Sequence, residues 1–308
     1  MLKIVKASEP MTVSQLVLCI YAAPGLGKTT LGYTAEDPLD FDCDHGAYRA
    51  KNRKDTVTVN SWKDIEVVTP EDLTAYKTII LDTAGRALDY LTDDIITKNP
   101  KHGRGGALTL QGYGELKSRF TTWLKALRRL GKDVVLIAHM DEQRQGDDMI
   151  ERLDVQGGSK GEIYKSADAM GRIYMKGNER VLDFSPRENS FGKNPCEVAI
   201  MPVKLENTKC LAEIIALIKS RLNEQVVAAK VADQELQDWN IAIGECDSAE
   251  ALNALLPEIK KAAQAVRFIA QRRSKELGCS FDRAKGLYVP PAGAVKATTD
   301  ERTYADLA

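Results

Sequence analysis

The sequence predicts an α/β fold with a mainly parallel central sheet, followed by a small helical appendage at the C-terminus. Short, wholly apolar runs alternate with helical patterns through the first two thirds of the chain. A glycine-rich turn lies between the first apolar run and the first helical pattern, and the composition shifts after about Leu205. Strands that are apolar throughout and bounded by helices indicate a parallel sheet covered on both faces.

The elements follow from these patterns in chain order. Strands are predicted at Gln15–Tyr21, Pro38–Asp42, Thr56–Val59, Thr78–Leu81 and Val134–Ala138. Helices are predicted at Lys28–Thr34 and at Gly114–Leu130, where apolar residues recur at helical spacing. Three more strands, with little helix between them, are predicted at Gly171–Met175, Arg180–Phe184 and Val198–Val203. Because they are so close in sequence, we expect them to extend the same sheet in antiparallel fashion.

The C-terminal third has helical patterns only. Helices are predicted at Leu211–Leu222 and Glu235–Ile243, and a capping-box pattern at Asp247–Glu250 predicts the start of another. Pro257 suits the first turn of a last helix that runs to about Leu277. We therefore expect a core at residues 1–222, a helical appendage at 223–288 and a disordered tail at 289–308, which is rich in proline and threonine.

Composition narrows the functional classes. The formal net charge of the 308 residues is −1, so no global basic field attracts nucleic acid or a membrane, and any nucleic-acid contact must come from a local patch. The six cysteines are scattered, without a CxxC pair or a nearby histidine cluster, which indicates free thiols in a reducing compartment. No segment has the length and apolarity of a signal peptide or a membrane helix. We expect a soluble, cytoplasmic protein without a membrane partner.

The glycine-rich turn is a phosphate-binding pattern. It reads Ala22-Ala23-Pro24-Gly25-Leu26-Gly27-Lys28-Thr29, followed by Thr30. The two glycines allow the backbone to turn its N–H groups toward a phosphate, and the helix N-terminus adds partial positive charge. Lys28 is expected to reach the β- and γ-phosphates, and Thr29 to ligand Mg²⁺. The cofactors are therefore ATP and Mg²⁺.

Four polar residues lie at or just beyond the ends of other predicted strands. Asp82 ends the Thr78–Leu81 run and is expected to hold Mg²⁺, although an aspartate there can also cap the next turn. Asp42 and Asp44 both follow the second strand, and Asp44, which lies further beyond the strand end, is expected to polarise the attacking water. His139 ends the Val134–Ala138 run. It is expected to bond the γ-phosphate or the lytic water, with a capping or core role as the alternative.

These pieces resemble the RecA recombinase family in their order along the chain. The segment FDCDHGA resembles the catalytic-carboxylate segment of that family, with Asp44 in place of glutamate. TIILDTA resembles the magnesium-binding strand, and VVLIAHM the strand that ends in a phosphate-sensing glutamine, with His139 in that place. The segment Gly157–Ser166 is similar to the end of the second DNA-binding loop of the family. The missing N-terminal polymerising helix argues against RecA-style filaments.

The sequence is more similar still to a group of phage RecA-like P-loop nucleotide-binding proteins that includes ATP-dependent single-strand annealing proteins. The shared features are PLDFDCDHG and the late motif Phe191–Pro195, and the resemblance covers about residues 12–220. It implies an ATPase active in phage DNA recombination, which binds single-stranded DNA and forms a homo-oligomer. A single-strand DNA-binding protein is a further expected partner, through the appendage.

Two segments carry the expected DNA contacts. Lys98, Lys101, His102 and Arg104 lie among glycines in KNPKHGRGG, where a flexible backbone can follow a phosphate chain, or where the segment is merely a solvated loop. The second segment, Asp141–Gly161, is assigned by the resemblance alone. Its cations are outnumbered by acids; they are Arg144, Arg152 and Lys160.

Two other functions fit the same phosphate loop. A small-molecule kinase would need an arginine-rich lid over a second substrate, and the sequence has no such segment. A motor or loader ATPase that acts on a protein partner in DNA replication would need no DNA contact at all. Stimulation of ATP hydrolysis by single-stranded DNA separates the recombination protein from both.

Overall fold

The computed structural model describes residues 12–145, 148–155 and 159–290, and it divides into two compact units. The core unit ends at Val226 and the C-terminal unit begins at Val227. Most of the tail predicted to be disordered lies outside the described residues. Among the residues that are described, no helix is both long and apolar enough to cross a membrane.

The core unit is built on one mixed sheet, which has nine strands in the described part of the chain. From β1 to one edge of the sheet, the parallel strands are β1 (Val17–Ala22), β7 (Asp133–Gln145), β4 (Thr78–Asp82), β2 (Pro38–Asp42) and β3 (Thr56–Thr58), in that spatial order. On the other side of β1 lie β9 (Ala169–Lys176), β10 (Glu179–Asp183) and β11 (Met201–Pro202). Strand β8 (Asp148–Leu153) pairs only with β7.

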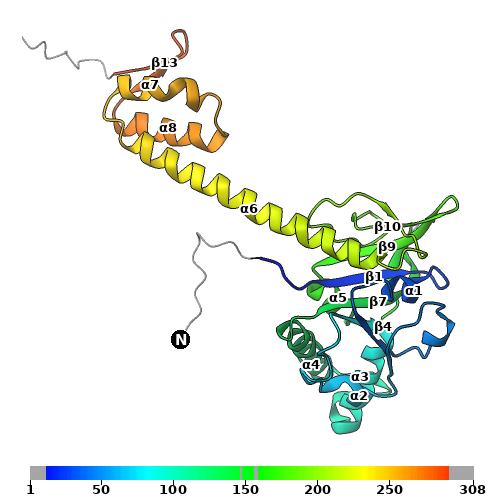
Figure 1. Cartoon of the computed structure of the whole chain (residues 1–308). Helices are drawn as coiled ribbons and strands as arrows, with labels where there is room; N and C mark the ends of the chain where they lie inside the picture. Colours follow the sequence, from blue (N-terminus) through cyan, green and yellow to red (C-terminus); the bar gives the residue numbers. More distant parts are fainter. Residues whose placement is uncertain (1–11, 146–147, 156–158, 291–308) are drawn as a thin grey trace, which may run out of the picture. The chain divides into compact units, whose positions relative to one another are not determined.

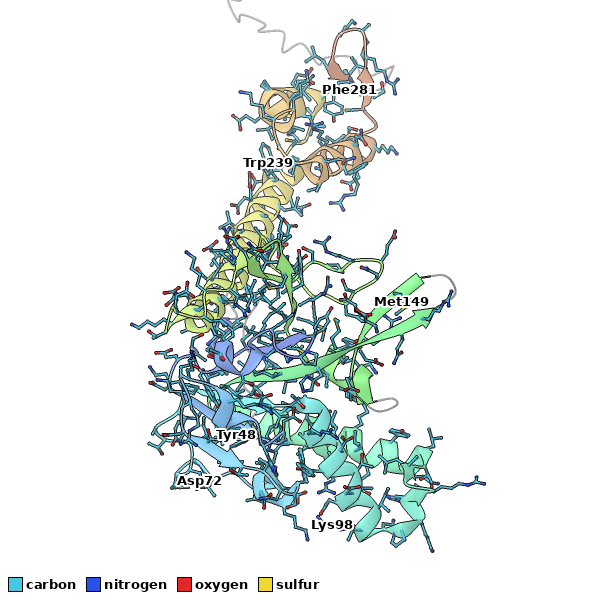
Figure 2. All side chains as sticks on the ribbon, turned by 90° about the vertical axis from the view of Figure 1, so that its right-hand side faces the viewer. Tyr48, Asp72, Lys98, Met149, Trp239 and Phe281 are labelled. Atoms are coloured by element: carbon cyan, nitrogen blue, oxygen red, sulfur yellow. The ribbon has the colours of Figure 1, made fainter. Side chains whose placement is uncertain are left out.

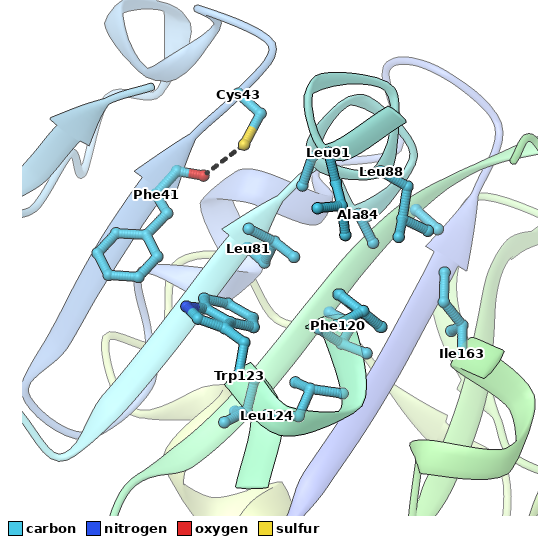
Figure 3. Packing of buried hydrophobic residues seen from close by; sticks show 14 of the residues in the cluster. Phe41, Cys43, Leu81, Ala84, Leu88, Leu91, Phe120, Trp123, Leu124 and Ile163 are labelled. Carbon is cyan, nitrogen blue, oxygen red and sulfur yellow. Dashed lines mark hydrogen bonds between the residues drawn. The ribbon is translucent and has the colours of Figure 1, made fainter. Parts of the chain in front are cut away.

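Helices cover both faces of this sheet, as the wholly apolar strands predicted (Figure 1). One face packs against α3 (Ala84–Lys98), α4 (Leu110–Arg129) and α5 (Ser159–Ser166). Phe120 and Trp123 of α4 lie over Leu81 of β4 in this cluster (Figure 3). The other face packs against α1 (Lys28–Gly32) and the first turns of α6 (Cys210–Gly244). The remaining helical segments of the core unit are α2 (Lys63–Glu66), η1 (Ala47–Arg49) and η2 (Pro100–His102).

The alternation of side chains along each strand determines which polar residues lie on the face of the sheet that α1 covers. Ile80 of β4 and Ile137 of β7 pack in the same cluster as α1, so Asp82 and His139, two residues further on, lie on that face too. A Cβ atom on Gly32 of α1 would lie 3.2 Å from Ile80 and 3.3 Å from Ile137. The glycine therefore lets the helix approach the sheet closely and brings its N-terminus to the carboxyl ends of the strands.

Two expectations for the sheet are corrected. Strand β7 does not end at His139 but continues to Gln145 and folds back as β8, in a hairpin where a loop was expected. Its residues beyond His139 are mainly polar, so no apolar run marked the extension, and cross-strand pairing stabilises it instead. Strand β9 is parallel to β1, and only β10 and β11 are antiparallel to their neighbours.

The C-terminal unit also differs from the expected helices. The two helices expected at Leu211–Leu222 and Glu235–Ile243 are one helix, α6, because the residues between them are good helix formers without glycine or proline. Helix α7 (Ala249–Ile259) begins after the N-cap Ser248, whose hydroxyl accepts from the N–H of Ala251 at 3.2 Å. Pro257 lies within α7, rather than in the first turn of α8 (Gln264–Glu276). An unexpected hairpin, β12 (Ser280–Asp282) and β13 (Leu287–Val289), completes this unit.

Candidate nucleotide site

The phosphate loop connects β1 to α1 at the carboxyl edge of the sheet. Gly25 and Gly27 both have φ of 81°, a left-handed conformation that favours glycine. A Cβ on Gly27 would also lie 2.7 Å from a methyl group of Leu205, which would have to shift. Two left-handed glycines turn the backbone tightly in the segment that the sequence predicted to cradle phosphates, Ala23 to Thr30.

Lys28 is the buried cation of this loop. Its side chain is folded back, and Nζ donates to the carbonyl oxygens of Ala22 at 3.0 Å and Ala23 at 3.1 Å. Burial lowers the pKa of the Lys28 ammonium, while the charges of Asp82 and Asp44 act in the opposite direction. These carbonyl oxygens hold the ammonium group beside the phosphate loop, where the negative charge of a bound phosphate would attract it.

Thr29 and Asp82 form a hydrogen-bonded pair at the start of α1. The Thr29 hydroxyl donates to Asp82 Oδ2 at 2.5 Å. The pKa of Asp82 is raised to about 6, chiefly by burial; Asp44 and Asp42 also act to raise it, while the Thr29 hydrogen bond and Lys28 act to lower it. A hydroxyl and a carboxylate at hydrogen-bond distance are oxygen ligands of the kind Mg²⁺ takes beside nucleotide phosphates. The pair therefore fits the metal role predicted for it.

Asp44 and His139 form a second pair across the same cavity. His139 Nε2 lies 2.8 Å from Asp44 Oδ2, so Nε2 carries the hydrogen when the carboxylate is ionised. This hydrogen bond lowers the pKa of Asp44 against the effect of burial, and Arg86, with Nε 3.5 Å from Asp44 Oδ1, lowers it further. Thr83 also donates to Asp44, at 3.4 Å. Sequence analysis identified Asp44 and His139 as separate candidate residues, but no sequence pattern indicated that their side chains are hydrogen-bonded.

Asp42, the alternative to Asp44, is occupied elsewhere. Its two carboxylate oxygens accept the backbone N–H groups of Gly46 and Ala47, each at 2.9 Å. The side chain is therefore a cap for the turn η1, and only 5% of the residue is exposed to solvent. Of the two aspartates after β2, Asp44 is the one that faces the phosphate loop.

One cavity of about 460 Å³ is lined by Lys28, Thr29, Asp44, Asp82 and His139. Its walls are formed by the phosphate loop, by Asp82 and His139, and by the segment after β2. Arg49 and Ala50 of that segment also line it; sequence analysis did not single them out, because no motif marks them. A larger cavity, of about 890 Å³, lies between Tyr33, Arg53, Lys209 and their neighbours; the phosphate loop, Asp44, Asp82 and His139 are not among its lining residues.

The first segment predicted to bind DNA is not a free loop. After η2 it forms a short hairpin, β5 (Gly103–Arg104) and β6 (Ala107–Leu108). Lys98, labelled in Figure 2, has its Nζ 2.9 Å from Asp94, and His102 Nδ1 lies 2.8 Å from Glu115. Lys101 and Arg104 are exposed and have no acidic partner within the part of the chain that is described.

The second segment is the β7–β8 hairpin. Arg152 lies 4.4 Å from the centre of the Phe191 ring, which stacks in turn on Tyr164, so this arginine packs against the core unit. Arg144 is exposed on β7 and pairs in register with Met149. Met149, 51% exposed, marks the hairpin in Figure 2. The side chain of Lys160, and the Gly157–Gly158 part of the segment Gly157–Ser166, lie outside the described residues.

A phosphate loop joined to a parallel sheet, with a threonine and an aspartate placed for a metal ion, defines a P-loop ATPase. Residues 14–196 match a family model described as an AAA domain (AAA_24), which is more than half of the 308 residues. The chain therefore belongs to this family of AAA-domain ATPases.

No curated protein matches this sequence. Among solved structures, the fold is similar to one described as a prototypical ATPase from the type III secretion system of pathogenic bacteria. The two sequences are 12% identical and the TM-score is 0.33, with 52% of this chain and 51% of that chain covered. The match thus spans about half of that ATPase, and no functional conclusion is drawn from it.

Proposed function

We propose that the chain hydrolyses ATP in the cavity at the phosphate loop, and that hydrolysis is coupled to single-stranded DNA in annealing or recombination. The observation that supports hydrolysis is the convergence of three groups on one cavity: Lys28, the Thr29–Asp82 pair and the Asp44–His139 pair. Binding alone would require only the first two.

The roles of these residues follow from their positions. The loop N–H groups and Lys28 bind the phosphates, and Thr29 with Asp82 holds Mg²⁺, whose charge stabilises the transferred phosphoryl group. Asp44 is left to orient the attacking water. Because His139 keeps the pKa of Asp44 low, the carboxylate is a weak base that accepts a hydrogen bond from water and takes up the proton late in the reaction.

The continuity of β7 supports a link from this site to a partner. His139 lies within β7, and the same strand continues for six residues to Gln145 in the exposed hairpin. A change in the Asp44–His139 contact when the γ-phosphate leaves would therefore act directly on the base of the hairpin. This is a mechanical connection through paired strands, with Met140 opposite Leu153 at its base.

Single-stranded DNA is the partner that we propose, because both segments predicted to bind DNA carry exposed cations. Lys101 of η2 and Arg104 of the β5–β6 hairpin are exposed, and Arg144 is exposed on β7. Cations of this kind bind a phosphate backbone without reading its sequence. Lys98 and His102 contribute less than the sequence suggested, because acidic neighbours hold them.

The test is the steady-state rate of ATP hydrolysis with and without a single-stranded oligonucleotide, with Asp44→Asn as the inactive control. We expect single strands to increase the rate and a nucleoside or sugar to leave it unchanged. A rate indifferent to DNA would contradict the proposed coupling and favour a motor that acts on a protein. Transfer of phosphate to a small molecule would indicate a kinase.

A further inference from the structure

The turn after Asp44 is anchored firmly beside the nucleotide cavity. Asp42 accepts the N–H groups of Gly46 and Ala47 at one end, and Ala47 is buried. At the other end, Asn52 Nδ2 donates to the carbonyl oxygen of Thr30 in α1 at 3.0 Å. The turn is thus tied both to β2 and to the helix that follows the phosphate loop, so a side chain on it has a defined place relative to the phosphates.

Arg49 ends this turn, and its guanidinium lies over Gly46. A Cβ atom on Gly46 would lie 2.4 Å from Arg49 Nη2. The φ angle of Gly46 is −107°, which other residues adopt without strain, so the backbone does not require glycine there. What the glycine provides is room for the guanidinium. Both residues line the same cavity as the phosphate loop.

The charge of Arg49 is not used by the protein itself. Among the described residues, no carboxylate lies within ion-pair distance of its guanidinium, and its contact is with the Tyr48 ring, 5.4 Å from the ring centre. Arg86 differs, since it lies 3.5 Å from Asp44 and 3.4 Å from Asp89. A guanidinium has five N–H donors and no acceptor, and its planar fork matches the oxygens of a phosphate.

The walls of the cavity contain two carboxylates, Asp44 and Asp82, and the cations Lys28 and Arg49. Arg86 lies 3.5 Å from Asp44, so the charge of that carboxylate is already paired without Arg49. An incoming nucleoside triphosphate is itself strongly anionic, and its terminal phosphate is the part that lies toward Asp44 if Asp44 orients the attacking water.

We propose that Arg49 is a phosphate-binding residue, which contacts the terminal phosphate of a nucleoside triphosphate from within the same chain, and that Gly46 provides the space for its guanidinium. This inference rests on the nucleotide site proposed above. It makes the site selective for triphosphate over diphosphate without any contribution from a neighbouring subunit.

The experiment measures dissociation constants for ADP and for a non-hydrolysable ATP analogue, both with Mg²⁺. In Arg49→Ala, binding of the analogue should weaken about 10- to 100-fold, as for one lost hydrogen-bonded charge contact, while ADP binding stays within about twofold. Arg49→Lys should recover part of the affinity. Gly46→Ala should reproduce part of the loss, since it displaces the guanidinium but keeps its charge. Arg53→Ala, the same change on a residue that lines the other cavity, is the matched control.

The outcomes separate this inference from the proposed function. If wild type and Arg49→Ala bind both nucleotides equally well and hydrolyse ATP, the Arg49 contact is overturned and the ATPase stands. Equal losses for ADP and the analogue would also overturn it, because Arg49 would then act elsewhere than on the terminal phosphate. If the wild type binds both nucleotides but does not hydrolyse ATP, the proposed function fails. The ratio of the dissociation constants for ADP and the analogue, compared between wild type and Arg49→Ala, still tests the Arg49 contact. The melting temperature without nucleotide should match that of the wild type in every variant, Gly46→Ala included.

Discussion

Replacing Asp82 by asparagine should stabilise the nucleotide-free protein while it removes the metal site. Burial raises the pKa of this carboxyl from 3.8 to about 6, and that value already includes the attraction of Lys28. Since a tenfold change in proton affinity is worth about 1.4 kcal/mol, the buried charge costs about 3 kcal/mol of folding free energy near neutral pH. Asparagine has no such charge, and its oxygen can still accept the Thr29 hydroxyl.

The sign follows from linkage. A raised pKa in the folded state means that protonation stabilises the fold, and that this stabilisation is lost as the pH rises through about 6. The advantage of Asp82→Asn should therefore be complete above about pH 6 and fade between about pH 6 and pH 4. Asp44→Asn should show the opposite sign, because the pKa of Asp44 is lowered and its charge stabilises the fold.

The assay is thermal unfolding of the full chain without nucleotide or Mg²⁺, followed across this pH range. At about 2–4 °C for each kcal/mol, the core unit of Asp82→Asn should melt about 6–12 °C above wild type near pH 7.5. Addition of Mg²⁺ and ATP should stabilise the wild type more than the variant, because the variant has lost a metal ligand. A melting temperature at or below that of wild type at this pH would refute the reasoning.

Three other changes test the site and its surroundings. Lys28→Ala should abolish ATP hydrolysis, checked by phosphate release with circular dichroism as the control for folding; unchanged turnover would remove the nucleotide-site argument. Asp44→Asn should bind ATP but hydrolyse it about 10²–10⁴-fold more slowly, and normal turnover would place the base elsewhere. The double variant Lys101→Ala/Arg104→Ala should change the salt slope of single-stranded DNA binding by about 1.4 in a fluorescence titration, at about 0.7 for each contact, and identical slopes would make η2 and the β5–β6 hairpin solvated features.

A shorter chain that ends at Val226 should keep its ATPase activity, because every residue of the candidate site lies in the core unit. Phosphate release by the truncated protein is the measurement. We expect its activity in the cell to be impaired, through a lost partner such as a single-strand DNA-binding protein. Failure of the truncated chain to fold would show instead that the core unit depends on the residues after Val226.

The sequence by itself determined the features that depend on neighbours in the chain. The apolar runs within β1, β4 and β7 predicted a buried parallel sheet, and the phosphate loop between β1 and α1 followed from glycine, lysine and threonine at fixed spacing. Such patterns are local because strand alternation and the left-handed glycines of a tight turn are properties of short segments. The family match at residues 14–196 confirms the class of ATPase to which these patterns pointed.

Only the tertiary structure decided which polar residues meet. Asp42 and Asp44 are two positions apart, yet one caps a turn and the other bonds His139, ninety-five residues away. His102 was equivalent to Lys101 as a cation in the sequence, and it differs because Glu115 of α4 lies beside it. Hydrogen bonds and ion pairs act over a few ångströms of space, whatever the separation along the chain, so no local pattern records them. Arg49 is the clearest case, since its place beside the phosphates depends on anchors at Asp42 and Thr30.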